Sequence, residues 1–147
     1  MGNGFTEAEV RDAWEHFVAV GDSGDWDAWA DLHTVDGVWV EHHLGTFHGR
    51  EAIRAAITSV MALAPPTMSF PVEWVVIDGT RVVYYPWQVL PHPAGGEDLR
   101  FGCVTILEYA GDGQFSYQED LYNPTEGERV FGDWLAAGGV LPTPPAG

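Results

Sequence analysis

The stretch GDWDAWADLHTVDGVWVEHHLGTFHGREAI, residues 24–53, carries most of the information about the fold. Residues 25–33 predict a short helix, because their tryptophans recur on one face and acidic residues lie near the positive N-terminal end. Residues 38–43 predict a strand, and the glycines at 45 and 49 bracket a predicted turn. Another helix then begins. Helix, strand and helix therefore follow one another without a linker.

The flanking segments extend this pattern on both sides. Thr6 to Glu9 fits a capping box, and the apolar residues from Val10 to Val18 recur at helical spacing, which predicts a helix over residues 6–21. Downstream, apolar residues from Ile53 to Val60 continue the helix that begins near residue 50. The paired prolines after residue 64 end that helix.

The second half of the chain is rich in β-forming residues. Four runs, residues 68–77, 81–89, 101–109 and 115–122, are separated by glycine turns and by a proline and glycine loop. They predict a strongly curved antiparallel sheet. A capping box at Thr125 and Glu128 predicts a C-terminal helix ending near residue 138. We expect one α+β domain over residues 1–147, with helices on one face of the sheet and an irregular tail at residues 138–147.

Charge excludes two classes of partner. The 147 residues contain 22 Asp and Glu against 6 Lys and Arg, a net charge of −16, and all six cations are arginines. No basic surface is available for phosphates or anionic lipids, so we expect no nucleic acid and no membrane as partners. The single cysteine, Cys103, cannot form an intramolecular disulfide, and the N-terminus shows no apolar leader. We therefore expect a cytoplasmic protein.

The residues quoted above carry a family resemblance. The runs at residues 24–32, 36–41 and 45–53 resemble the SnoaL-like branch of the nuclear transport factor two-like superfamily, and the order of elements fits over nearly the whole chain. The resemblance implies a conical, cystatin-like half-barrel, with the N-terminal helices on the concave face of the sheet and a deep apolar pocket inside. These motifs describe a scaffold and do not select a reaction.

Glu41 is the first candidate catalytic residue. In the ketosteroid isomerases of this superfamily the proton-transferring carboxylate lies on the corresponding strand, and a gapless alignment brings Glu41 onto it. The same alignment places Phe17 and Thr105 where that mechanism needs two oxyanion donors, so a ketosteroid isomerase mechanism is not expected. The alternative for Glu41 is a surface carboxylate or an ion pair with Arg50 or Arg54.

Asp120 is the second candidate. In the last predicted strand Gln118, Asp120 and Tyr122 share one face, and the resemblance turns that face toward the pocket. SnoaL-type cyclases use an Asp near this end of the sheet as acid and base. The alternative is a structural carboxylate bonded to the backbone or to Tyr85. Two carboxylates meeting in an apolar pocket would have shifted pKa values.

His43 is the imidazole that we expect to join them. Its neighbour His42 points to the opposite face of the strand, so His42, His43 and His48 cannot easily share an ion, and no metal is expected. No glycine-rich strand-to-helix element is followed by a lysine, so no nucleotide cofactor is expected.

Aromatic residues make up 13% of the chain, which is enough for a core and a ligand-contacting wall together. An aromatic stripe of this kind is compatible with either role. The predicted ligand-binding residues are Trp14, Phe17, Trp39, Tyr85, Trp87 and Tyr122.

These observations favour one function and leave a second open. We expect cofactor-free acid/base chemistry (isomerisation, dehydration or cyclisation, in an isomerase, lyase or cyclase) on a small hydrophobic molecule of the polycyclic, polyketide, steroid or terpenoid-like class. Epoxide hydrolysis is less favoured, because no inward arginine lies between two aspartates. The alternative is a non-catalytic ligand-binding or dimerising domain. We expect a homodimer formed through the outer face of the sheet, where Trp74 and Val76 lie.

Overall fold

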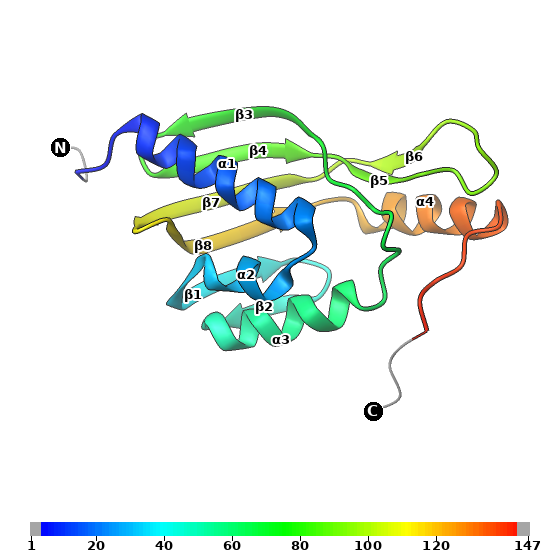
Figure 1. The fold of residues 1–147 in the computed structure, drawn as a ribbon, viewed down its shortest axis with the longest axis horizontal. Helices are drawn as coiled ribbons and strands as arrows, with labels where there is room; N and C mark the ends of the chain where they lie inside the picture. The colour runs from blue at the N-terminus through cyan, green and yellow to red at the C-terminus, as the bar shows by residue number, and fades with distance from the viewer. Residues whose placement is uncertain (1–3, 144–147) are drawn as a thin grey trace.

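The computed structural model describes residues 4–143. These residues form four helices and eight strands, with most of the helices in the first half of the chain, most of the strands in the second half and one helix at the end (Figure 1). In chain order they are α1 (Glu7–Ser23), α2 (Trp26–Asp31), β1 (His33–Glu41), β2 (Gly45–His48), α3 (Arg50–Met61), β3 (Val72–Asp78), β4 (Arg81–Pro86), β5 (Gln88–Leu90), β6 (Leu99–Phe101), β7 (Val104–Gly111), β8 (Gln114–Leu121) and α4 (Pro124–Ala136).

Six strands form one mixed sheet in the order β2-β1-β8-β7-β4-β3, and β5 pairs with β6 in a separate hairpin. The expected α+β class is confirmed, but the expectation of an antiparallel sheet is wrong for one pair, because β1 and β8 run parallel. The chain leaves β1 through β2 and α3, forms the antiparallel strands, and returns in β8 along the free edge of β1. Parallel pairing of this kind requires a long connection, which this chain supplies.

Strand pairing also moves several predicted boundaries. Helix α2 ends at Asp31 because β1 already begins at His33, which pairs with Phe115 of β8. At its other end β1 stops at Glu41, so His43 lies in a turn and not on the strand as predicted. The predicted turn at residues 45–49 is mostly strand β2, which pairs with β1.

The helix ends follow local capping chemistry. The Thr6 hydroxyl accepts the backbone N–H of Glu9 at 3.0 Å, as the capping box predicted. At α4 the cap is Asn123, whose side chain accepts the N–H of Thr125 at 3.0 Å, so the predicted box at Thr125 and Glu128 is wrong. Residues 139–143 form no helix or strand, and the rest of the predicted tail, residues 144–147, lies outside the described residues.

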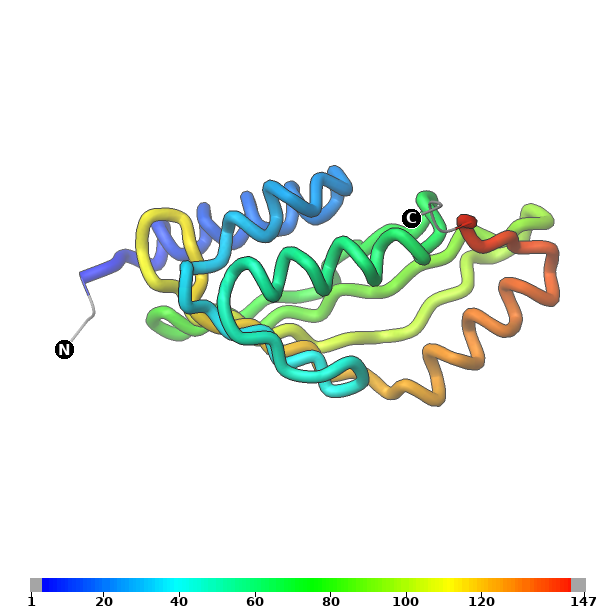
Figure 2. Tube along the Cα trace, turned by 90° about the horizontal axis from the view of Figure 1, so that it is seen from below, coloured from blue at the N-terminus to red at the C-terminus, as the bar shows by residue number. Residues whose placement is uncertain are grey.

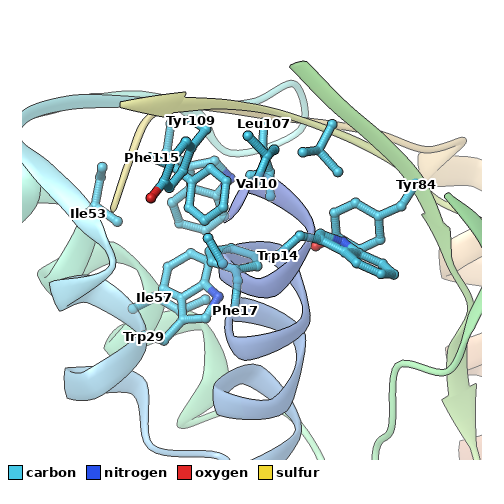
Figure 3. Close-up of a cluster of buried hydrophobic side chains, with 13 residues drawn as sticks. Val10, Trp14, Phe17, Trp29, Ile53, Ile57, Tyr84, Leu107, Tyr109 and Phe115 are labelled. Atoms are coloured by element: carbon cyan, nitrogen blue, oxygen red, sulfur yellow. The ribbon is translucent and has the colours of Figure 1, made fainter. Parts of the chain in front are cut away.

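Helices α1, α2 and α3 lie over one face of the large sheet (Figures 1 and 2). Their apolar faces form a core with it, in which Phe17 contacts Trp29 and Phe115 at ring distances of 5.6 and 5.4 Å (Figure 3). A second cluster joins Trp134 of α4 to Leu90 of the β5–β6 hairpin. In residues 4–143 no helix is long and apolar enough to cross a membrane.

Candidate functional site

A cavity of about 600 Å³ opens between the helices and the sheet. Helices α1 to α4 contribute to its wall, together with strand β1 and strands β3 to β8. Most of the wall is aromatic or aliphatic, for example Phe17, Trp26, Trp39, Met61, Phe101 and Phe131. A pocket of this size and polarity is typical of small-molecule sites.

One row of polar side chains crosses four neighbouring strands at this wall. Register partners run from Glu41 on β1 to Asp120 on β8, Thr105 on β7 and Tyr84 on β4. All four line the cavity. Partners in one row point to the same face of a sheet, so the pairing itself collects two carboxyls and two hydroxyls. We call these four residues the cross-strand row.

Asp120 is held by three donors. Its Oδ1 accepts the Thr105 hydroxyl at 2.6 Å, while its Oδ2 accepts the Trp39 indole N–H at 2.7 Å and the Gln118 amide at 3.0 Å. Burial raises the pKa of Asp120 above its ordinary value of 3.8, although the three donors oppose this shift; the charge of Glu41 adds to it. The carboxyl is therefore fixed in position and retains a proton at higher pH than a free aspartate.

Glu41 lies beside it, only 6% exposed. Its two oxygens accept the backbone N–H of His43 at 2.7 Å and the Tyr122 hydroxyl at 3.0 Å. The alternative ion pairs with arginine are not formed, because the Arg50 guanidinium donates to the His33 carbonyl and Arg54 pairs with acids of α2 and α3. Burial also raises the pKa of Tyr122, so its hydroxyl remains a donor.

The predicted His43 and its neighbours His42 and His48 have different surroundings in the structure. His43 is exposed in the turn after β1, where it lines the cavity and its ring contacts Tyr122. His42 pairs with Glu119 at 2.6 Å, and this hydrogen bond lowers the pKa of Glu119. His48 is exposed on β2. Within residues 4–143 no three His, Cys, Asp or Glu side chains are grouped so that they could hold a metal ion.

Comparison with known protein families identifies the family of this chain. The model of the SnoaL-like domain matches residues 10–118. The chain belongs to the SnoaL-like domain family. No curated protein sequence matches it. The family resemblance read from residues 24–53 is confirmed, and solved structures with the same nuclear transport factor two-like fold include isomerase-like and hydrolase-like proteins.

Three solved structures show how widely this fold is used. TerC, crystallised with polyporic acid, has a TM-score of 0.68 at 18% identity, over 84% of this chain and 98% of that one. An LEH-like epoxide hydrolase from M. tuberculosis has a TM-score of 0.69 at 16% identity, over 88% and 94% of the two chains. A protein of ketosteroid isomerase-like fold from Catenulispora acidiphila, in complex with trimethylamine, has a TM-score of 0.63 at 21% identity, over 80% and 88%. These likenesses describe a fold and not an activity.

Within this SnoaL-like fold three of the six aromatics predicted to bind a ligand line the cavity and three do not. Phe17, Trp39 and Tyr122 line the cavity. Trp14 lies behind the wall, with its ring 5.5 Å from that of Tyr84. The remaining two, Tyr85 and Trp87, meet edge to face away from the cavity, in a group with Trp74. Alternation on β4 explains this placement, since Tyr84 points inward and its neighbour must point outward.

Sequence reasoning missed Tyr84, Gln118 and His33. Burial raises the pKa of Tyr84 well above its ordinary value, so its hydroxyl remains protonated at the cavity wall. Gln118 was placed on the same strand face as Asp120 but was assigned no role. His33 was assigned to a helix, although it begins β1 and is completely buried. For Gln118 the alternation of β8 was a sufficient signal. For His33 the strand pairing was needed, and for Tyr84 the packing of α1 against the sheet.

Proposed function

We propose that this SnoaL-like protein binds a small hydrophobic molecule, of the polycyclic, polyketide, steroid or terpenoid-like class, inside a conical half-barrel formed by its sheet and helices. The support is the cavity of about 600 Å³ with its largely apolar wall. Such pockets bury most of the surface of a ligand and orient it with a few polar groups. The polyporic acid of TerC and the trimethylamine of the Catenulispora protein accompany the same fold and agree with this proposal.

In this proposal the bound molecule undergoes cofactor-free acid/base chemistry: isomerisation, dehydration or cyclisation. The observation that carries it is Asp120, a carboxyl of raised pKa fixed by three donors at an apolar cavity wall. A carboxylate whose pKa approaches the working pH is a better proton acceptor than a free aspartate. The neighbouring charge of Glu41 contributes to this tuning.

The roles follow from position. Asp120 removes a proton from a carbon next to a substrate carbonyl, and the bonding electrons form an enolate. Tyr84, whose hydroxyl stays protonated beside Thr105, is the donor that we assign to the enolate oxygen. The proton returns from Asp120 to another atom of the substrate, so no oxidant or cofactor is needed. Glu41 is the second acid/base group, and His43 at the cavity mouth exchanges protons with solvent.

Hydrogen exchange tests this chemistry without knowledge of the natural substrate. The probe is 2-tetralone, a neutral bicyclic ketone, and the measurement is deuterium uptake from D₂O at its α-carbon by NMR. We expect the protein to accelerate uptake, and Asp120→Asn to reduce that rate about 10²–10⁴-fold. The matched control is Glu119→Gln, which alters the next carboxyl of β8, on the opposite face beside His42.

The outcomes separate two functions. Uptake that is unchanged in Asp120→Asn would remove Asp120 from the mechanism. Binding of 2-tetralone and other neutral bicyclic ketones with no exchange above background would support the second function, a ligand-binding or dimerising domain without catalysis. The contacts of the two carboxyls also favour this second function. Every oxygen of Asp120 and Glu41 already accepts a hydrogen bond within the protein.

A further inference from the structure

Behind Asp120 lies a buried pair of side chains that the proposed mechanism does not use. Gln118 is 4% exposed and His33 is completely buried. The Gln118 amide nitrogen lies 3.0 Å from Asp120 Oδ2, and its amide oxygen lies 2.8 Å from His33 Nε2. The amide therefore connects the carboxyl at the cavity wall to an imidazole inside the core.

The imidazole faces an oxygen on each side. Its Nε2 faces the Gln118 amide oxygen, and its Nδ1 lies 3.3 Å from the Ala30 carbonyl oxygen. Burial lowers the pKa of His33, with a further contribution from the charge of Arg50, although the hydrogen bonds oppose the shift. A neutral imidazole carries one N–H, so it can donate to only one of these two oxygens at a time.

Two arrangements satisfy the donors and acceptors around this amide. With Asp120 ionised, Gln118 donates its N–H to the carboxylate and accepts the Nε2–H of His33. With Asp120 protonated, the Gln118 amide is turned by 180°, so that its oxygen faces Asp120 and its nitrogen faces His33. The carboxyl then donates to the amide oxygen, and the amide N–H donates to an unprotonated Nε2. The ring proton then lies on Nδ1 and bonds the Ala30 carbonyl.

The two arrangements differ in one unpaired atom. In the second, Asp120 still accepts the Trp39 indole N–H on Oδ2, and the ring Nδ1–H bonds the Ala30 carbonyl. In the first, the unprotonated Nδ1 faces that carbonyl oxygen at 3.3 Å and accepts no hydrogen bond from it. An unpaired buried acceptor costs free energy, so the first arrangement forms when the ionised carboxylate of Asp120 takes the Gln118 N–H, and the proton on Asp120 selects between the two.

We propose that His33 and Gln118 are positioning residues that link the protonation of Asp120 to the tautomer of a buried, neutral imidazole. One proton joins Asp120 from substrate or solvent. The ring keeps a single proton, which is exchanged from Nε2 to Nδ1, so the three residues gain one proton in total. The carboxyl thus has a matched hydrogen-bonding partner in both of its protonation states.

Other groups around the pair must be separated from this linkage. The cavity side of Asp120 faces Glu41, Tyr84, Tyr122 and Cys103. Burial raises the pKa of Cys103 to about 12, and the two tyrosines are also raised, so none of these three ionises near neutral pH. Glu41 remains as the neighbouring acid.

Two further groups lie on neighbouring segments. Arg50 on α3 donates to the backbone carbonyl of His33. His43 contacts Tyr122 at the cavity mouth. In Glu41→Gln the linkage should persist, which separates it from the titration of Glu41.

NMR of the ligand-free protein tests the linkage. Protein labelled with ¹³C at aspartate carboxyls and ¹⁵N in histidine rings is titrated between about pH 4 and about pH 9. We expect the His33 ring signals to change from the Nδ1–H to the Nε2–H pattern as pH rises, with the same midpoint as the Asp120 carboxyl signal. A His33 tautomer that stays constant while Asp120 titrates, or a ring that becomes an imidazolium, would overturn the proposal.

Two variants sharpen the result. In Gln118→Met the Asp120 signal should still titrate, but the His33 tautomer should no longer follow it. In Asp120→Asn the tautomer should be the same at every pH, because the ionising group is gone. A tautomer change that persists in either variant shows a direct response of His33 to pH and contradicts the linkage. The linkage concerns the same carboxyl as the proposed function but needs no substrate, so failure of the exchange assay and failure of this titration are separate results.

Discussion

Glu41 and Asp120 are register partners in the parallel pairing of β1 with β8, and both side chains line the cavity. Neighbouring strands lie about 4.8 Å apart, so this pairing holds two carboxyls side by side at an apolar wall. Like charges in such a position resist double ionisation, and the charge of Glu41 contributes to the raised pKa of Asp120. The chemical character of the site therefore follows from one strand pairing.

The first prediction concerns stability of Asp120→Asn. A carboxyl whose pKa is raised by folding binds its proton more tightly in the folded than in the unfolded chain. Its stabilising contribution is complete below the ordinary pKa of 3.8, falls as pH rises toward the folded pKa, and is lost above it. We therefore expect Asp120→Asn to match or exceed the thermal stability of the unaltered protein near neutral pH, measured by unfolding monitored by circular dichroism.

The amide that Asp120→Asn introduces can also satisfy the neighbouring hydrogen-bonding groups. Its oxygen can accept from Trp39 and Gln118, and its N–H can donate to the Thr105 hydroxyl, so the network stays paired. Glu119→Gln is the control, because hydrogen bonds to His42 and Tyr117 lower the pKa of Glu119. That variant should lose stability at neutral pH. A clear loss of stability at neutral pH in Asp120→Asn would contradict the assigned raised pKa.

The second prediction concerns the indole of Trp39. In Trp39→Phe the aromatic ring remains in the wall, but the N–H that bonds Asp120 at 2.7 Å is removed. A hydrogen bond to a charged group contributes about 1.5–3 kcal/mol, so the ionised form of Asp120 becomes less stable and its pKa rises further. A ¹³C titration of the Asp120 carboxyl measures this shift.

Trp29→Phe provides the comparison. It replaces another indole of the cavity wall by a smaller ring without removing a donor to Asp120. The ring centroids of Trp29 and Trp39 lie 5.6 Å apart. Its effect on the Asp120 midpoint should be small. Equal shifts in the two variants would mean that packing, and not the indole N–H, controls the carboxyl.

Local signals were sufficient for much of the fold. The Thr6 cap and the helical spacing from Val10 to Val18 predicted α1, and alternation on β8 predicted that Asp120 and Tyr122 share a face. Both patterns depend only on neighbours in the chain. The family resemblance of residues 24–53 supplied the fold, and the family model confirms it.

The features that the sequence did not predict depend on contacts between residues that are distant in the chain. Alternation on β4 separates Tyr84 from Tyr85 but does not say which of them faces inward, and the packing of α1 decides it. Thr105 becomes a partner of Asp120 only through the β7–β8 register. His43 was expected on the strand, but no partner continues β1 beyond Glu41, where the β1–β2 turn begins.

The third prediction concerns assembly. Trp74 and Val76 on β3 are 42% and 57% exposed, which is high for large apolar side chains on one strand. We expect this outer face to form a two-fold dimer, visible as a doubled mass by light scattering at low micromolar concentration. Val76→Glu should give a monomer, while Val35→Glu, at a valine that is 74% exposed on β1, should leave the mass unchanged. A monomeric mass for the unaltered protein would contradict the prediction.

The fourth prediction concerns the charge of the ligand. Four carboxyl groups line the cavity wall formed by the described residues, those of Asp22, Glu41, Asp120 and Glu128. The other ionisable groups of this wall are the imidazole of His43, two tyrosine hydroxyls and the thiol of Cys103. No arginine lines the wall formed by the described residues. An anionic ligand would therefore bring a charge of the same sign into a site of low dielectric constant, at a higher cost than on the surface.

Three probes of one shape isolate this effect: 1-adamantanol, 1-adamantylamine and adamantane-1-carboxylate. We expect the carboxylate to bind at least about tenfold more weakly than the alcohol near neutral pH, a difference of about 1.4 kcal/mol, measured by calorimetry. The amine should bind at least as well as the alcohol. In Glu41→Gln the penalty on the carboxylate should shrink, while in Glu119→Gln, on the opposite face of the sheet, it should remain. Equal affinities for the alcohol and the carboxylate would mean that the bound molecule does not reach the cross-strand row, and would place the ligand at the mouth of the cavity instead.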